Sequence, residues 1–561
     1  MRHSVNKKYI VYAVLGLVVI LFVALSVRSC STLIHKPEEG DEKASLYTGY
    51  EISEDKKLLV SGASYTDSTN PSKKGFTPYL RLDGVNVDNY YRQNYVIFGE
   101  SSEEISGVLT YRGNALRNSA TFGNAGIEDG IFSTTWKIKV EESIGLTEDL
   151  DCMGQPVIIK WDETRKQLLK LNESKKNKET LTEIIYASTD GKVYFLDLDN
   201  GSYSRNPLDL GCPVTGTGTI CPDGTPLYVV GAGDCSEGDT SEIYVIDLVS
   251  GAVIYTFGER SNFSVKPPEE KYNFSAAAVF SQASDCLITQ GENGVIYSYS
   301  VDAKMGSSEL SATFSQKAEY TYTVNDGEGG TNTAQFSSSP AAWGSYVYTT
   351  DTEGHLVCTN VNDWNTVWMR DLGASCDATP CIEVDEAAGT AYIYIGTSLR
   401  LEDGKKTAGT VYIYKLNAAN GDIIWRREYD ARVTKKTNGG VVAAACLGEN
   451  GLDDYVYFTI AGVGSKKSGM VVCLDKNDGG ERYSIELKHY SVSDPVAAYG
   501  EDGTGYVIIC DNRGNVFMLD GESGECLDTR ELGERITTSP IVYEDTLILA
   551  TEEQIYGIKL K

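Results

Sequence analysis

One pattern recurs along most of this 561-residue chain: an apolar strand, a tight turn, a second apolar strand, and a polar turn that closes on Gly or Asn. The apolar stretches alternate with polar residues or run unbroken, as half-buried and fully buried strands do. The closing residues lie 45 to 59 positions apart, at Gly201, Gly251, Gly306, Asn365, Gly421, Gly479 and Gly524. Propeller blades have about this period, so the repeat predicts an all-β propeller.

The repeat region has an incomplete unit at its C-terminal end and a single unpaired strand before its first unit. Seven units fill residues 154–532, and only three strands follow at 539–560. An isolated strand, TTWKIKV, stands before the first unit at 134–140. A propeller removes its open edge by pairing an N-terminal strand into the last blade. We therefore expect an eight-bladed β-propeller of four-stranded blades over 134–561 with N- and C-terminal strand closure, and a leader packed on it at 76–133.

A small or polar residue followed by proline stands upstream of several units. Proline at the first residue of a strand loses no ladder hydrogen bond. These dipeptides therefore mark where the innermost strand of a blade begins. The prolines are Pro213, Pro340, Pro380, Pro495 and Pro540.

The N-terminus predicts a membrane anchor. Eighteen residues without a charge, 10–27, are just long enough to span a bilayer as a helix, which we place at 9–27. Arg2, Lys7 and Lys8 precede it, so residues 1–8 should be cytoplasmic and the rest extracytoplasmic. Residues 28–75 are polar and predict a mostly disordered tether. A lipoprotein signal ending at Cys30 is the alternative to this single-pass location in the cell membrane.

Composition narrows the chemistry. The formal charge of −29 excludes a partner bound through a phosphate backbone, so we expect no nucleic acid. Four histidines supply few bases or metal ligands, and no C-x-x-C pair predicts a zinc site. Cys376/Cys381 and Cys212/Cys221 are locally plausible disulfides. Free thiols in apolar runs are the other interpretation, and it fits Cys286, Cys358, Cys473 and Cys510.

The repeats resemble those of the pyrroloquinoline-quinone-type propellers, the quinoprotein alcohol dehydrogenase-like family. The likeness is clearest at Tyr186–Gly201 and is supported by Trp136, Trp368 and Trp425. The stretch GVLTYRGNALRNSATFG at 107–123 resembles the lead-in of exported, membrane-anchored members from Gram-positive bacteria. The family includes quinone enzymes and non-catalytic scaffolds, such as the lipoprotein of the outer-membrane barrel-assembly machine.

The resemblance implies a test for a cofactor. Family members that use the quinone hold it with two adjacent cysteines, a stacking Trp and a Ca²⁺ set, and this chain has no adjacent cysteines. The Asp-rich stretches at Asp197–Gly201 and Asp475–Gly479 have the residues of tight turns and lack the Glu of a calcium loop. We therefore expect neither pyrroloquinoline quinone nor calcium, and no metal site.

Two groups of residues are candidates for binding. Trp364 lies in the polar turn NVNDWN and could stack on a sugar, although aromatic residues more often pack between blades. Arg426, Arg427 and Arg432, with Lys435 and Lys436, form a cationic stretch that could meet an anionic partner or could protect a sheet edge. The leading hypothesis is a membrane-anchored, non-catalytic binding or scaffold module for an envelope protein or polysaccharide. The alternative is a quinoprotein-type oxidoreductase or a polysaccharide-active enzyme.

Overall fold

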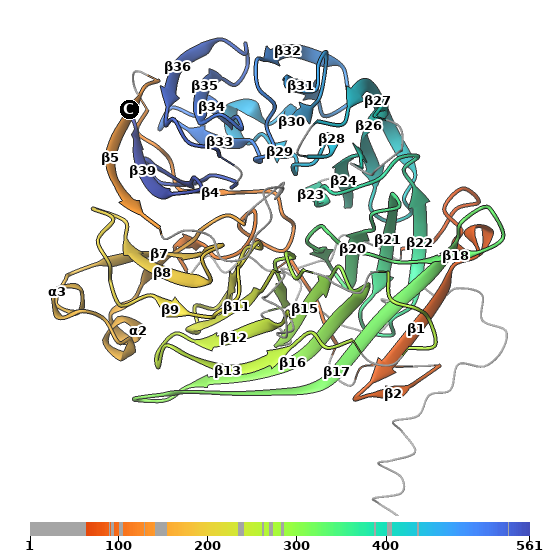
Figure 1. Cartoon of the computed structure of the whole chain (residues 1–561), viewed down its shortest axis with the longest axis horizontal. Coiled ribbons are helices and arrows are strands. Elements are labelled where there is room, and N and C mark those ends of the chain that lie inside the picture. The colour runs from red at the N-terminus through yellow and green to blue at the C-terminus, as the bar shows by residue number, and fades with distance from the viewer. Residues whose placement is uncertain are drawn as a thin grey trace, which may run out of the picture. The chain divides into compact units, whose positions relative to one another are not determined.

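Antiparallel sheets stand side by side in a ring, with the first strand of each toward the centre (Figure 1). The computed structural model describes residues 63–561 except 89, 91, 93–94, 100–104, 128–129, 141–153, 234–240, 261–262, 269–272, 282–284, 386–388, 401–406, 435–436 and 537. This arrangement is a β-propeller, so the prediction of an all-β propeller fold is confirmed.

Seven blades are formed by strands that follow one another in the chain. The first contains β6 (Val157–Trp161), β7 (Leu181–Ala187), β8 (Lys192–Asp197) and β9 (Leu208–Asp209). The second contains β10 (Thr219–Ile220), β11 (Leu227–Gly231), β12 (Ile243–Asp247) and β13 (Ala252–Phe257). The third contains β14 (Val279–Ser281), β15 (Cys286–Gly291), β16 (Val295–Met305) and β17 (Leu310–Asn325). The fourth contains β19 (Ala341–Trp343), β20 (Tyr346–Thr350), β21 (His355–Asn360) and β22 (Thr366–Asp371).

The remaining three of these blades continue around the ring. The fifth contains β23 (Cys381–Asp385), β24 (Thr390–Gly396), β26 (Ala408–Asn417) and β27 (Ile423–Arg432). The sixth contains β28 (Gly439–Gly440), β29 (Cys446–Leu447), β30 (Tyr455–Ala461), β31 (Gly469–Asp475) and β32 (Glu481–Leu487), and β25 (Ser398–Leu399) pairs with β28. The seventh contains β33 (Val496–Tyr499), β34 (Gly505–Cys510), β35 (Asn515–Asp520) and β36 (Cys526–Glu531).

The last sheet joins both ends of the described chain. Its strand order is β4 (Thr121–Phe122), β37 (Ile541–Tyr543), β38 (Thr546–Ala550), β39 (Gln554–Leu560) and β5 (Phe132–Lys139). β5 runs antiparallel to β39, with Ile138 opposite Ile555 and Phe132 opposite Leu560. The predicted pairing of the isolated strand with the C-terminal strand is therefore confirmed.

The predicted construction of eight four-stranded blades is wrong. Seven blades come from consecutive strands, the closing sheet is a five-stranded composite, and three of the seven blades carry five, six or seven strands. Three of the extra strands come from the leader. β1 (Thr77–Leu82) and β2 (Val85–Asn86) extend the β14–β17 sheet, which β18 (Thr331–Thr333) also joins, and β3 (Gly107–Val108) pairs with β6. Blade edges carry unpaired backbone groups, and the leader satisfies them.

Helices are few in the part of the chain that the structure describes. α2 (Glu163–Leu168) and α3 (Glu173–Lys176) lie between β6 and β7, and the 3-10 turns are η1 (Pro71–Lys74) and η2 (Asn450–Leu452). None of these is long and apolar enough to cross a membrane. The predicted transmembrane helix at 9–27 lies outside the residues that the structure describes.

Tryptophans fasten neighbouring blades together and explain the closing glycines. Trp368 donates through Nε1 to the Ala418 carbonyl at 3.0 Å, and its ring covers Gly421. Gly421 has φ +69°, and a Cβ there would lie 2.6 Å from the ring. Trp136 and Trp425 pack in the same way on Gly201 and Gly479. At Gly201, Gly421 and Gly479 the repeat therefore ends in Gly because both the backbone conformation and the close ring require it.

The polar residue before each proline links inner strands around the ring. The Ala277 amide donates to Ser339 Oγ at 2.9 Å, and the Ser339 amide donates to Thr379 Oγ1 at 3.0 Å. The Ala444 amide donates to Asp494 Oδ1 at 2.7 Å. The residues after Pro340, Pro380, Pro495 and Pro540 begin β19, β23, β33 and β37. The predicted meaning of these dipeptides is confirmed at these four positions.

Candidate functional site

The leader crosses the axis of the propeller. From residues 105 to 123 its backbone accepts hydrogen bonds from one inner strand after another. The donors and acceptors are Ile220 N to Leu109 O, Ala342 N to Ala115 O, Ile382 N to Leu116 O and Val542 N to Ala120 O, at 2.8 to 3.0 Å. Figure 1 shows this part of the chain inside the ring. Four blades are thus joined through one short segment at their centre.

Two arginines of this segment are buried at the axis. Arg117 is fully buried and donates through Nε to the Pro340 carbonyl at 2.9 Å. Its Nη2 donates to the carbonyls of Ala277 and Ala278 at 2.9 and 3.0 Å. Among the residues that the structure describes it has no acidic partner, and burial lowers its pKa to about 9, which leaves it charged at neutral pH. The charge is held by carbonyl dipoles of two blades.

Arg112 joins the opposite side of the ring. Its Nη1 donates to the Pro495 carbonyl at 2.8 Å and its Nη2 to the Ala445 carbonyl at 2.7 Å. Burial opposes its charge most strongly, but the Asp494 carboxylate together with Cys446, Cys381 and Tyr111 outweighs burial and raises the pKa of the guanidinium. Both arginines have positive φ, 53° for Arg112 and 61° for Arg117. Each guanidinium bonds to the backbone of two blades. We call residues 105–123, which include both arginines, the hub of the propeller.

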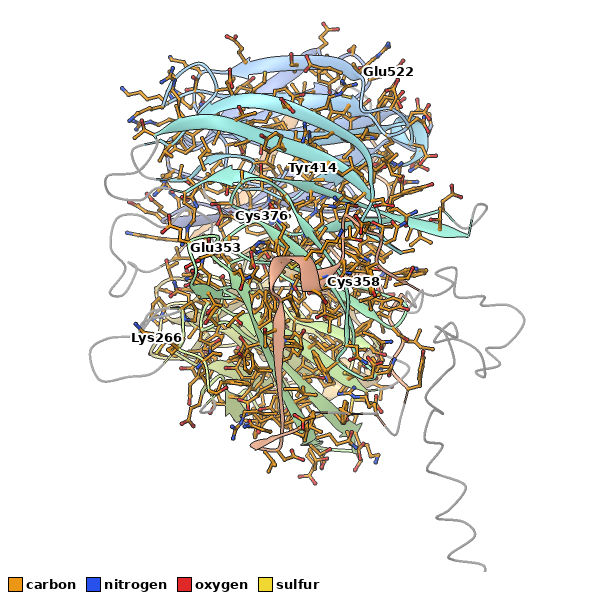
Figure 2. All side chains as sticks on the ribbon, turned by 90° about the vertical axis from the view of Figure 1, so that its right-hand side faces the viewer. Lys266, Glu353, Cys358, Cys376, Tyr414 and Glu522 are labelled. Carbon is orange, nitrogen blue, oxygen red and sulfur yellow. The ribbon has the colours of Figure 1, made fainter. Side chains whose placement is uncertain are left out.

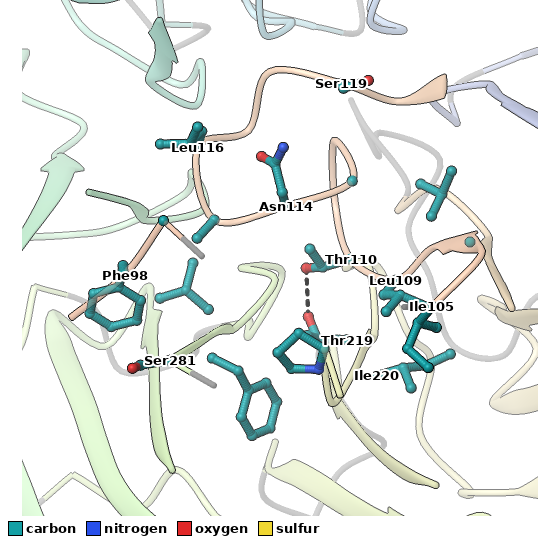
Figure 3. Close-up of a pocket in the computed structure, with 18 of the residues that line it drawn as sticks. Phe98, Ile105, Leu109, Thr110, Asn114, Leu116, Ser119, Thr219, Ile220 and Ser281 are labelled. Atoms are coloured by element: carbon teal, nitrogen blue, oxygen red, sulfur yellow. Dashed lines mark hydrogen bonds between the residues drawn. The ribbon is translucent and has the colours of Figure 1, made fainter. Parts of the chain in front are cut away.

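A pocket of about 300 Å³ lies beside this hub, between the leader and the ends of two inner strands (Figure 3). β10 contributes Thr219 and Ile220, and β14 contributes Val279–Ser281. The leader supplies most of the remaining wall, within 97–99, 105–110, 113–116 and 119–122. Among the residues that the structure describes, none that lines the pocket is charged, although charged residues make up 23% of the chain. The pocket therefore suits a neutral group.

The few polar groups of the wall are mostly bonded to one another. Thr110 Oγ1 and Thr219 Oγ1 are 2.8 Å apart, as the dashed line in Figure 3 marks. Ser281 Oγ donates to the Ile97 carbonyl at 2.6 Å. Asn114 Nδ2 donates to Asn118 Oδ1 at 2.8 Å, and Asn118 is in turn held by the Ile382 carbonyl at 3.1 Å. These bonds fix the wall and leave its apolar side chains facing the space.

Trp364 does not lie on an open surface. Its residue has φ 56° and is only 3% exposed. Its ring stacks on Tyr320 at a centroid distance of 5.5 Å, between the third and fourth blades. Aromatic packing between blades therefore uses the face that a sugar would need.

The three arginines of the cationic stretch are not gathered into one site. Arg426 lies over the Tyr412 ring and pairs with Glu428 at 2.5 Å. Arg427 donates through Nε to the Gly479 carbonyl, as Arg370 does to the Gly421 carbonyl one blade earlier. Adjacent strand residues point to opposite faces, so Arg426 and Arg427 diverge. Arg432 is exposed at the end of β27, and residues 435–436 lie outside the described ranges.

The two cysteine pairs that are close in sequence, Cys376/Cys381 and Cys212/Cys221, do not form disulfides. Cys376, Cys381 and Cys221 are free, whereas Cys212 is disulfide-bonded elsewhere. Cys286, Cys358, Cys473 and Cys510 are buried and free, which confirms their prediction as small apolar residues. Figure 2 shows Cys358 and Cys376 among the packed side chains of their blades.

Comparisons with known proteins bear on the fold. No protein-family model matches the chain, and no curated protein matches it. Solved structures do. The quinohemoprotein alcohol dehydrogenase of Comamonas testosteroni has TM-score 0.53 and 11% identity, covering 81% of this chain and 80% of that one. The dehydrogenase ADHIIG of Pseudomonas putida HK5 has TM-score 0.51 and 12% identity, with the same coverage. This chain shares their β-propeller fold. BamB from Moraxella catarrhalis also matches, with TM-score 0.45 and 14% identity, covering 77% of this chain and 98% of that one.

The residues present do not fit the quinone that such dehydrogenases imply. The quinone carries three carboxylates, and the pocket wall, over the residues described here, has no charged side chain to pair with them. Across the described residues no group of three or more His, Cys, Asp or Glu could hold a metal ion. The hub fills the axis itself. That the chain binds no quinone or calcium stays a prediction, since binding has not been measured.

Sequence reasoning missed both the hub and the pocket. The stretch 107–123 was noticed for its resemblance, and its two arginines carried no signal because buried arginines look like surface arginines in a sequence. The pocket walls come from three segments that are far apart in the sequence, within 97–122, 219–222 and 279–281. No local pattern reveals that such segments meet.

Proposed function

We propose that this chain is a non-catalytic binding or scaffold module for a protein or polysaccharide of the cell envelope. The observation that supports it best is the leader, which crosses the axis and bonds to the inner strands of four blades. A propeller surrounds a central channel, which is the natural place for a cofactor or a small substrate. Here the leader occupies that place, with Arg112 and Arg117 bonded to the inner strands. Binding is then left to the faces and rim of the ring.

We propose further that the module is held at a cell membrane with the propeller outside. The support is the uncharged run at 10–27 after Arg2, Lys7 and Lys8. The disulfide at Cys212 agrees with an oxidising compartment. Protease added to intact cells, or to spheroplasts where a second membrane intervenes, should remove the propeller. Full protection of residues 63–561 would contradict this location.

The experiment for the non-catalytic role uses the full chain with pyrroloquinoline quinone and Ca²⁺. We expect no stoichiometric binding of the quinone and no reduction of a dye acceptor with alcohols or sugars, because the donors that would hold the group are missing. Quinone binding together with alcohol-dependent dye reduction would refute the proposal. A quinoprotein dehydrogenase run in parallel serves as the positive control.

The experiment for the binding role asks whether the chain works in a complex. A reversible amine cross-linker applied to intact cells should shift the full chain to a discrete larger species. Repeating it after protein-digesting or polysaccharide-digesting treatment separates the two kinds of partner. A chain that stays monomeric under all these conditions would contradict a scaffold role.

A further inference from the structure

The pocket beside the hub has a wall that selects the chemistry of its occupant. Three phenylalanines line it, Phe98, Phe122 and Phe280, and within the described part of the wall no lining residue is charged. A charged group inside would lose its hydration and find no ion-pair partner, at a cost of several kcal/mol. A sugar would leave most of its hydroxyls without hydrogen bonds there, because the wall hydroxyls bond to one another or to the backbone. An apolar group has no such cost.

The size and opening of the pocket favour a side chain of a larger molecule over a free ligand. About 300 Å³ is at the lower limit of small-molecule sites, which run from about 300 to 1,000 Å³. Gly99 is exposed, and Ile97, Ile105, Leu116 and Phe122 are only half-buried. The occupant therefore remains open to solvent on one side, as a side chain attached to a larger molecule does. A free ligand is usually engulfed over most of its surface.

We propose that this pocket receives one aromatic side chain of a partner protein. Aromatic pairs gain about 0.5–1.5 kcal/mol beyond the area they bury. Three rings line the wall, of which Phe122 already stacks on Tyr543 at a centroid distance of 5.1 Å. Aromatic anchors in apolar pockets are the usual centres of protein interfaces. The inference rests on the proposed binding function and decides between its two kinds of partner, in favour of a protein at this face.

The test uses N-acetyl-4-fluorophenylalaninamide as the probe and the broadening of its ¹⁹F signal by the full chain. Burial of a phenyl group rather than its exposure contributes about 1.5–3 kcal/mol. We therefore expect this probe to bind about 10- to 100-fold more tightly than N-acetyl-alaninamide. Cellobiose and N-acetyl-aspartamide are expected to give no competition.

Two variants place the binding in the pocket. Ala115→Phe puts a ring into the space, and Ile105→Glu puts a carboxylate into the half-buried edge of the wall. Each should weaken the fluorinated probe at least tenfold. Both variants change half-buried residues, and the second keeps the test decisive if the first does not fold. Ile131→Glu is the matched control, because Ile131 is 42% exposed and does not line the pocket.

The outcomes separate the inference from the function on which it rests. Loss of probe binding in both variants but not in Ile131→Glu supports the aromatic pocket. Equal probe binding by all four proteins, or competition by cellobiose, overturns it. In that case a cross-linked complex in cells would still stand for the binding role, at another face. A monomer in cells together with a functional aromatic pocket would contradict the scaffold role alone.

Discussion

At the scale of single residues, Arg117 is the least ordinary group of the fold: a buried cation whose partners are carbonyl oxygens of two blades. Arg117→Met would leave these carbonyls without a donor in a buried place. A lost bond to a charged group costs about 1.5–3 kcal/mol. We expect a loss of at least about 3 kcal/mol, seen as a lower urea midpoint. Arg513→Met, at an exposed position, is the control, and equal midpoints for the two variants would contradict the hub.

His355 should make stability depend on pH. Its Nδ1 lies 2.9 Å from Asp351 Oδ2, which also accepts from Tyr322 at 2.9 Å. Burial lowers the pKa of His355 and Lys74 opposes its charge, but Asp351 and Asp371 outweigh both and raise the pKa. A raised pKa means that the stabilisation is fully present below the unfolded value of about 6.5 and is lost as the pH rises through the folded value.

His355→Gln should therefore reduce the unfolding free energy at pH 6 and change it less at pH 8.5. Urea titrations at the two pH values measure the difference. His489→Gln is the matched control, since His489 forms no ion pair among the described residues. A deficit of His355→Gln that stays constant between the two pH values, or grows as the pH rises, would show that the Asp351 contact does not carry the effect.

At the scale of elements, sequence features that repeat in every blade predicted the strands, whereas features that occur once did not predict the local structure. The closing glycines and the residue-proline dipeptides repeat once per blade, so the sequence was sufficient to place strands such as β19 and β37. Trp364 was a candidate for stacking because its neighbours in the turn are polar, and the structure shows that the turn folds its ring back onto Tyr320. Polarity of the flanking residues does not report where one side chain points.

Gly421 and Gly251 allow two reasons for a closing glycine to be tested separately: the left-handed backbone and the contact with a tryptophan ring. Gly421 and Gly251 have nearly the same φ, +69° and +67°. A Cβ at Gly421 would press on Trp368, while nothing lies within 4 Å of one at Gly251. Both alanine variants should lose about 1 kcal/mol for the left-handed backbone. Gly421→Ala should lose about 1–3 kcal/mol more by overpacking. Equal midpoints in urea would argue against the tryptophan contact as the reason for this glycine.

At the scale of the whole molecule, closure was predictable and the path of the leader was not. An odd strand at one end and a three-stranded unit at the other imply each other, because an open blade edge is unfavourable. By contrast, the leader bonds to inner strands from Ile220 to Val542, and these partners have only their place at the axis in common. The pocket could not be predicted for the same reason, because its walls come from segments that are brought together only when the ring closes.

The last prediction tests closure with a loss and a rescue. Deleting residues 130–141 removes β5 and leaves the β39 edge unpaired, so the chain should aggregate on size exclusion with light scattering. The Ile131 and Lys561 backbones exchange two hydrogen bonds, of 3.0 and 3.1 Å. A chain in which Asn-Gly joins Lys561 to a relocated copy of 131–139 should therefore fold β39 and β5 as a hairpin and recover the monomer. If the deleted chain stays monomeric and melts like the parent, or if the relocated strand fails to rescue it, pairing between β5 and β39 does not hold the ring closed.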